Sequence, residues 1–202
     1  WLIAAVFLWG GCVATAIAAP FNSVFFASVT HWVAQHPAAT EMLGPNAAML
    51  LAAPISAPII EEIAKALAVS MVFWLLRAEF DNIRDGIVYG ALVGVGFNWS
   101  EVALYVARGY AEHGVAPYGM QLGGRYALFG LGGRRMIRAI FGASLGLAQQ
   151  TRRNWLRIVA PLGGLGLAIA AHTINNALPL LEALASAEAG EPPSQWEAPP
   201  DM

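Results

Sequence analysis

Charge is scarce in this chain. Only 12% of its 202 residues are Asp, Glu, Lys or Arg, and lysine occurs once; a typical soluble domain has about 25% charged residues. Hydrophobic residues make up 57% of the sequence, and the mean hydropathy is +0.56. This shortage of polar surface excludes a globular domain that faces water on all sides. It indicates instead a protein that crosses a lipid bilayer several times.

The single cysteine and the slightly negative net charge limit the disulfides that the chain can form and the partners that it can bind. The single cysteine, Cys12, excludes an internal disulfide. The net charge of −2 argues against nucleic acid as a partner, because binding to phosphates requires an excess of Lys and Arg. We therefore expect the partners to be the lipid bilayer and other membrane proteins, either as substrates or as neighbouring subunits. Residue 1 is Trp and not Met, so we also expect the natural N-terminus to lie upstream.

Apolar segments predict an all-α, multi-span transmembrane helical bundle with about five to six spans, since a span needs about 20 mostly apolar residues. The first span is predicted over 1–19 and ends at Pro20, and the amphipathic segment 21–36 is predicted to be interfacial or re-entrant. Prolines interrupt residues 46–58, which are expected to form a half-span or a kinked continuation. Proline suits a helix start, so a helix is expected from Ile59 to Arg77. Later spans are predicted at 86–107, 134–150 and 155–181.

The chain is expected to divide into three regions. Residues 1–54 hold the N-terminal span with the interfacial or re-entrant segment, and residues 55–181 form the helical core that carries the candidate site. Residues 182–202 hold five acids, four prolines and no base, which is typical of a solvated tail. Arginines in the loops at 77–85 and 151–157 slightly favour a cytoplasmic location for that face.

Glycines recur at every fourth position in two of the predicted spans. Such faces allow helices to approach closely in lipid, so we interpret them as packing surfaces. The two series are Gly86, Gly90 and Gly94, and Gly142 and Gly146.

Ionisable side chains at membrane depth are costly, and they point to function by default. The stretch PIIEEIAKA at 58–66 places Glu61, Glu62 and Lys65 within an apolar run. Lys65 follows the two acids by four and three residues, so it lies on the same side of the helix as both. Two adjacent carboxylates in a low-dielectric site should not both ionise easily. One of them could therefore act as an acid or a base.

Polar groups from three helices are predicted to lie at one depth. Glu62 precedes Arg77 by 15 residues, Glu101 follows Gly86 by 15, and His172 follows Arg157 by 15. At 1.5 Å per residue each group lies about 22 Å from the face that holds the loops at 77–85 and 151–157. Because the helices alternate in direction, this shared depth predicts one polar site, nearer the opposite face.

Two more residues share faces with these groups. Asn176 follows His172 by four residues, and Phe97 precedes Glu101 by four, so its ring could form a wall beside the acid. A histidine and a carboxamide could bind a metal or donate hydrogen bonds to an oxyanion. Structural alternatives stay open: an ion pair of Glu61 and Glu62 with Lys65, interhelical hydrogen bonding by His172 and Asn176, and an arginine partner for Glu101 at Arg134 or Arg138.

Four stretches occur in a recognisable order: IIEEIAKAL, FDNIRDGIVYGALVGVGFNWSEVALY, RAIFGASLG and AHTINNAL. Together they resemble the PrsW family of intramembrane proteases over about residues 55–180. The chain is more distantly similar to the CAAX-prenyl endopeptidase and bacteriocin-processing group. The motif EExxK alone is weak, but four ordered motifs are fairly specific.

The resemblance implies peptide-bond hydrolysis within or beside the membrane, typically of a single-span substrate such as an anti-sigma factor. It implies that Glu61 and Glu62 are an essential acid pair, that Glu101 occupies the second motif, and that His172 and Asn176 are metal ligands or oxyanion stabilisers. Zn²⁺ held by Glu62, Glu101 and His172 and a metal-free, glutamate-activated water both stay open. The expected location is the bacterial cytoplasmic membrane.

Two positions depart from the family pattern. Val102 stands where members usually have Asn, and Arg134 stands where they usually have His, eight residues before Gly142. Arginine cannot ligate zinc or act as a base at neutral pH, but it could pair with Glu101 or Glu62 and silence the site. The alternative function is therefore a catalytically inactive homologue that serves as a structural subunit of a membrane complex. A proton or ion pathway is disfavoured, because no polar residues lead to the first face.

Overall fold

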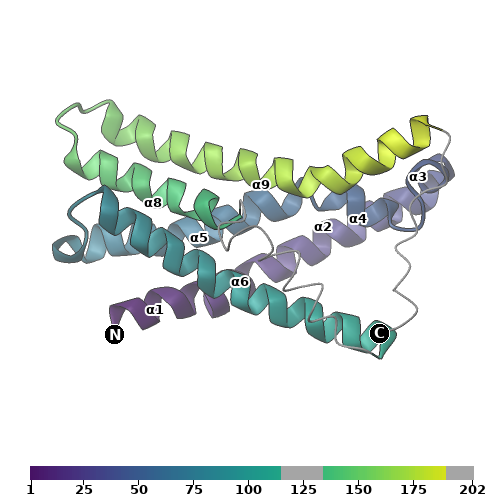
Figure 1. Cartoon of the computed structure of the whole chain (residues 1–202), viewed down its shortest axis with the longest axis horizontal. Helices are drawn as coiled ribbons and strands as arrows, with labels where there is room; N and C mark the ends of the chain where they lie inside the picture. The colour runs from purple at the N-terminus through teal and green to yellow at the C-terminus, as the bar shows by residue number, and fades with distance from the viewer. Residues whose placement is uncertain (115–133, 190–202) are drawn as a thin grey trace.

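The computed structural model describes residues 1–114 and 134–189, and in this part of the chain all regular structure is helical. The long helices run side by side as an elongated bundle (Figure 1), which confirms the predicted all-α fold. The elements are α1 Leu2–Leu8, η1 Trp9–Ala14, α2 Thr15–Gln35, α3 Pro37–Leu43, α4 Ala47–Ala52, α5 Ser56–Leu75, η2 Arg77–Glu79, α6 Ile83–His113, α8 Arg134–Gln150 and α9 Leu156–Glu188.

Within residues 1–114 and 134–189, three helical stretches are long and apolar enough to cross a bilayer. They are Leu2–Gln35, Ile83–Ala111 and Leu156–Glu188. Helix α5 has 20 residues and α8 has 17. Both lengths lie within the range of about 17–25 residues for a crossing helix. Helix α5 differs from these three stretches in carrying two acids and a lysine among its apolar residues.

The predicted break at Pro20 is wrong. Elements α1, η1 and α2 form one continuous helix from Leu2 to Gln35, and Pro20 lies inside α2. Residues 21–35 are therefore part of a membrane-length helix and not a separate interfacial segment. A proline interrupts one hydrogen bond of a helix, but lipid offers the backbone no alternative partner, so membrane helices tolerate proline better than soluble ones do.

The helix that carries the acids is close to its prediction. Helix α5 begins at Ser56 and ends at Leu75, so Pro58 lies in its first turn, where backbone N–H groups have no partner within the helix. Helix α8 matches its predicted bounds. Helix α9 extends to Glu188, which carries it into the segment predicted as a tail, and residues 190–202 lie outside the described part of the chain.

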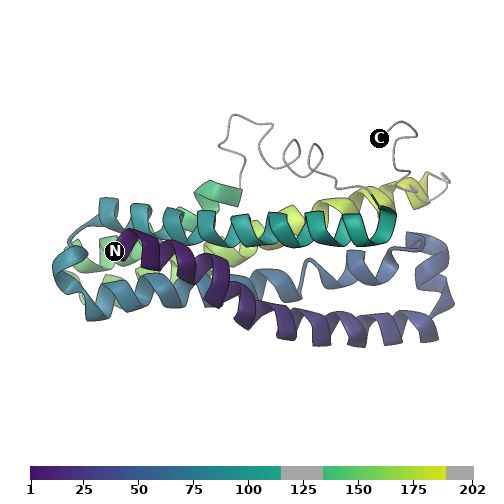
Figure 2. The ribbon, with the colours of Figure 1, turned by 90° about the horizontal axis from the view of Figure 1, so that it is seen from below.

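Packing places α5 in contact with helices from distant parts of the chain. It packs against α2, α6 and α9, while α8 lies between α6 and α9 and η1 packs on α6. Figure 2 shows the continuous α1–α2 helix along one side of the bundle. At one end, Phe73, Arg77 and Arg157 line a common cavity, so the loops at 77–85 and 151–157 lie on one face, as predicted.

The glycine faces are packing surfaces within this chain. Gly86 on α6 and Gly142 on α8 lie backbone against backbone, and a side chain at either position would collide with the other's carbonyl group. We expect Gly86→Ala and Gly142→Ala to lower the free energy of unfolding by about 1–3 kcal/mol each, the usual cost of overpacking. The matched control is Gly163→Ala on α9, where a Cβ atom would have nothing within 4 Å. Thermal unfolding in detergent checks this, and equal effects at all three positions would contradict it.

Candidate active site

Helix α5 holds a compact cluster of charges. Glu61, Glu62 and Lys65 are all buried, with exposed fractions of 9%, 5% and 5%. Lys65 Nζ lies 2.8 Å from Glu62 Oε1 and 3.4 Å from Glu61 Oε2. The ammonium group also lies over the ring of Phe97 from α6, 4.0 Å from its centre. The lysine therefore compensates the charges of both buried acids.

Helix α9 brings His172 to the same cluster. Its side chain is buried, and Nδ1–H donates to Glu62 Oε1 over 2.9 Å. The same carboxylate oxygen also accepts from Lys65. Glu62 is thus held between a lysine of its own helix and a histidine 110 residues away in the chain.

Glu61 lies beside open space. It lines a cavity of about 500 Å³ together with Phe97, Glu101 and Arg108 of α6. It also lines a neighbouring cavity of about 210 Å³ that includes Tyr105 and Arg108. Glu62 lines neither of these two cavities. Of the two acids, Glu61 is therefore the one that water or a substrate in these cavities would meet.

Glu101 reaches the larger cavity from α6. Its side chain is half-buried and lines the same space as Glu61, so the structure places the second-motif acid at the same cavity as one member of the acid pair. The side chains of Arg134 and Arg138, expected as partners of Glu101, lie outside the described residues.

Asn176 lies one helical turn beyond His172. Its Nδ2 donates to the backbone carbonyl of Ala53 over 3.1 Å, at the break between α4 and α5. This contact ties α9 to the start of the helix that carries the acids. The contribution of Asn176 to an oxyanion site stays a prediction.

Sequence reasoning missed two polar residues beside the acids. Asn22 Nδ2 donates to Glu61 Oε1 over 3.4 Å, and Ser56 Oγ donates to Asn22 Oδ1 over 2.7 Å. A carboxamide within a membrane helix is itself a signal of function. The sequence alone did not reveal this role of Asn22, because residues 21–36 have the pattern of an interfacial segment, where polar side chains are common.

The arrangement of the donors does not fit a zinc ion. Within residues 1–114 and 134–189 no three His, Cys, Asp or Glu side chains are grouped so that they could hold a metal. A structural or catalytic zinc site needs three or four such donors turned to one point. Instead, Glu62 Oε1 accepts from the Lys65 ammonium and from His172. The described donors therefore do not form a zinc site.

A buried, ion-paired cluster beside a cavity, enclosed by apolar helices, defines an integral membrane protein with a candidate hydrolytic centre. The chain belongs to the PrsW family: the family model described as PrsW family intramembrane metalloprotease matches residues 1–189. The match includes the N-terminal helix, which the four motifs did not cover. It supports a membrane protease role. Comparisons with curated proteins and with solved structures gave no match.

Proposed function

We propose that this protein is an intramembrane endopeptidase that hydrolyses peptide bonds of membrane protein substrates. One observation carries the proposal: the buried carboxylate of Glu61 faces a cavity of about 500 Å³ and lies against the Glu62–Lys65–His172 cluster. Family membership supports the reaction class. A carboxylate of this kind is the general base that peptide hydrolysis requires when water is the nucleophile.

In the proposed mechanism Glu61 is the base. It takes a proton from a water molecule while the water oxygen attacks the carbonyl carbon of the scissile peptide bond. When the C–N bond breaks, Glu61 returns that proton to the leaving amine. Glu61 suits this role better than Glu62, because Glu61 lines both cavities, whereas Glu62 lines neither and its Oε1 accepts two short hydrogen bonds.

The other residues would prepare the site around that step. His172, oriented by Glu62, is the proposed donor to the oxyanion that forms on the attacked carbonyl; it lines neither cavity, so the substrate must extend past Glu61 to reach it. Glu101 orients the water from the opposite side of the cavity. Lys65 keeps the two neighbouring carboxylates compensated, and Asn176 holds the start of α5 in place through Ala53.

The proposal is tested by following cleavage of a co-expressed single-span substrate. We expect His172→Ala to lower cleavage by about 10²–10³-fold, the usual loss for one oxyanion donor. Glu62→Gln should also lower cleavage, because it weakens the attachment of both Lys65 and His172. His36→Ala is the matched control, since His36 is exposed and stacks on Trp32 at the end of α2. Undiminished cleavage in either test variant would remove the assigned chemistry.

The proposed substrates are single-span membrane proteins, and the proposed location is the bacterial cytoplasmic membrane. Metal analysis of active, purified protein is a direct check on the mechanism. One zinc per chain, required for turnover, would contradict the metal-free mechanism.

The alternative, a silenced structural subunit, has a separate test. Its motivation is Arg134 together with the glycine faces. The structure weakens the second argument, because Gly86 and Gly142 pack against each other within the chain. Replacement of Arg134 by His discriminates between the two functions. Cleavage by the wild-type protein supports the enzyme, whereas cleavage that appears only in Arg134→His would identify a silenced one.

A further inference from the structure

A chain of hydrogen bonds links α2 to the acid pair on α5. Ser56 Oγ lies 2.7 Å from Asn22 Oδ1, and Asn22 Nδ2 lies 3.4 Å from Glu61 Oε1. An ionised carboxylate only accepts hydrogen bonds, so the amide nitrogen of Asn22 must face Glu61 and its oxygen must face Ser56. The serine hydroxyl therefore donates, and both hydrogen bonds are directed toward Glu61.

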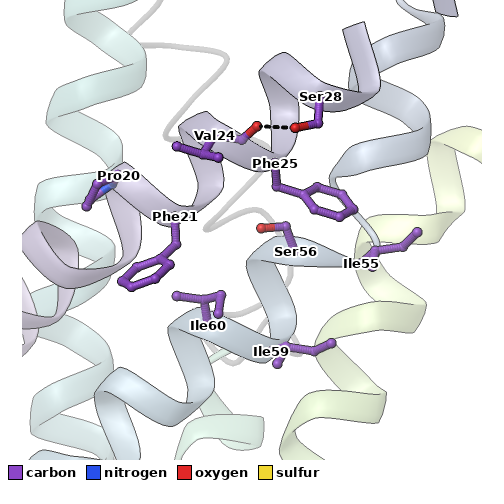
Figure 3. Close-up of a pocket in the computed structure, with 9 residues that line it drawn as sticks. All are labelled: Pro20, Phe21, Val24, Phe25, Ser28, Ile55, Ser56, Ile59 and Ile60. Atoms are coloured by element: carbon purple, nitrogen blue, oxygen red, sulfur yellow. Dashed lines mark hydrogen bonds between the residues drawn. The ribbon is translucent and has the colours of Figure 1, made fainter. Parts of the chain in front are cut away.

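Ser56 makes its bond at the edge of an apolar groove of about 660 Å³ between α2 and α5. Figure 3 shows Ser56 near Phe21 and Phe25 on the groove side, and Ser56 also lines the cavity of about 210 Å³ together with Asn22 and Glu61. A partly buried hydrogen bond of this kind fixes the orientation of its partner more firmly than one in water. The bond to Asn22 is therefore well suited to hold the carboxamide in one orientation.

Ser28 provides an internal comparison. It lines the same groove, but its hydroxyl donates to the carbonyl of Val24 in its own helix over 2.9 Å, as the dashed line in Figure 3 shows. Ser28 and Ser56 thus line the same groove but differ in burial and in partner, because Ser28 is exposed whereas Ser56 is half-buried and also lines the cavity of about 210 Å³. Only the bond of Ser56 belongs to the chain that ends at Glu61.

We propose that Asn22 is a positioning residue for Glu61 and that Ser56 acts through Asn22 by fixing the orientation of its carboxamide. Asn22 contacts one oxygen of the Glu61 carboxylate, and Lys65 contacts the other. Held from α2 and from α5, the carboxylate stays directed at the cavity that it shares with Glu101. The inference rests on the proposed function, in which Glu61 is the base. It assigns a role to the N-terminal helix, which carries none of the four motifs.

The first test measures kcat and KM for a single-span substrate with the purified protein. We expect Asn22→Ala to lower kcat by about 10- to 100-fold, the scale of loss when a catalytic group is misplaced. KM should stay within about twofold, because the proposal assigns the carboxamide of Asn22 to Glu61 and not to the substrate, although Asn22 also lines the cavities. Asn22→Asp should be as poor as Asn22→Ala because it loses the donor, and Asn22→Gln should recover part of kcat. A wild-type kcat in Asn22→Ala, or equal losses in all three variants, would overturn the proposal.

The second test asks whether Ser56 acts through Asn22. We expect Ser56→Ala to lower kcat by a few-fold and Ser28→Ala to leave it unchanged. The double variant Asn22→Ala/Ser56→Ala should match Asn22→Ala alone, because residues that act in one network are not additive. Fully additive losses, or equal losses in the two serine variants, would contradict the proposed chain.

The third test does not depend on activity. Dicyclohexylcarbodiimide is an apolar reagent that modifies protonated carboxyl groups, and peptide mass spectrometry locates the modified residue. Loss of the Asn22 donor favours the protonated form of Glu61, so Glu61 should be labelled several-fold faster in Asn22→Ala than in the wild-type protein or Ser28→Ala. Glu101, which lines the same cavity, serves as the internal reference. The charged groups around Glu61 are unchanged in all variants: Glu62, Lys65, Glu101 and His172.

The outcomes of these tests separate the inference from the proposed function. If the wild-type protein cleaves no membrane substrate, the proposed function fails, and labelling still decides whether Asn22 holds Glu61. An unchanged rate of labelling at Glu61 in Asn22→Ala would then overturn the positioning role. If the wild-type protein cleaves and the Asn22 variants behave like it, the protease stands and only this inference falls.

Discussion

Replacement of Glu61 by Gln is expected to reduce cleavage of a single-span substrate by about 10²–10⁴-fold, the usual contribution of general acid–base catalysis, because glutamine cannot take a proton. The change keeps the size of the side chain and its contact with Asn22, so the fold should be preserved. The measurement is the rate of substrate cleavage by purified protein in liposomes.

The matched control for this prediction is Glu41→Gln. Glu41 is an exposed acid on α3, away from the cluster, and its replacement should leave the rate unchanged. Thermal unfolding of both variants shows whether the protein is still folded. If Glu61→Gln retains activity while Glu62→Gln loses it, Glu62 is the base and the assignment of the base from the cavities is wrong.

Replacement of Lys65 by Met is expected to have the largest effect on stability. It leaves Glu61 and Glu62 buried side by side without a cation. In the wild-type protein Lys65 Nζ lies 3.4 Å from Glu61 Oε2 and 2.8 Å from Glu62 Oε1. Removal of one partner from a buried ion pair costs about 3–5 kcal/mol. We expect the free energy of unfolding in detergent to fall by an amount in that range, with a marked drop in the unfolding temperature.

The double variant Lys65→Met/Glu62→Gln separates charge from packing. Because it removes a carboxylate together with its cation, it should recover a large part of the lost stability. Arg152→Met is the control for loss of an exposed positive charge, since Arg152 is exposed in the loop before α9, and it should change stability by no more than about 0.5 kcal/mol. Failure of the double variant to recover any stability would mean that the lysine stem, and not its charge, supports the site.

Part of the candidate site follows from spacing along the chain. The i+3 and i+4 positions of Lys65 predicted its contacts with both acids, and the structure shows these contacts. Equal depth from one face predicted that Glu62 and His172 would lie together, and they are 2.9 Å apart. These inferences succeeded because helix rise and periodicity depend only on local backbone geometry.

Other features could not be predicted in this way. The position of Asn22 beside Glu61 depends on α2 continuing through Pro20, and the single sequence favoured a break there. The orientation of Asn176 toward Ala53 depends on where the break between α4 and α5 falls. In both cases a tertiary contact overrides a local preference, because lipid leaves the backbone and polar side chains no partners except other parts of the chain.

The sequence by itself determined that this is a helical membrane protein, which residues are ionisable at membrane depth, and the motifs that place it in its family. The tertiary structure alone decided which of the two adjacent acids faces the cavity. It also decided that the N-terminal helix supplies a hydrogen-bond donor to Glu61, and that Lys65 and His172 both donate to Oε1 of Glu62. The physical reason is helix rotation. Neighbouring residues on a helix point about 100° apart, so packing against α2, α6 and α9 settles which of them meets the cavity.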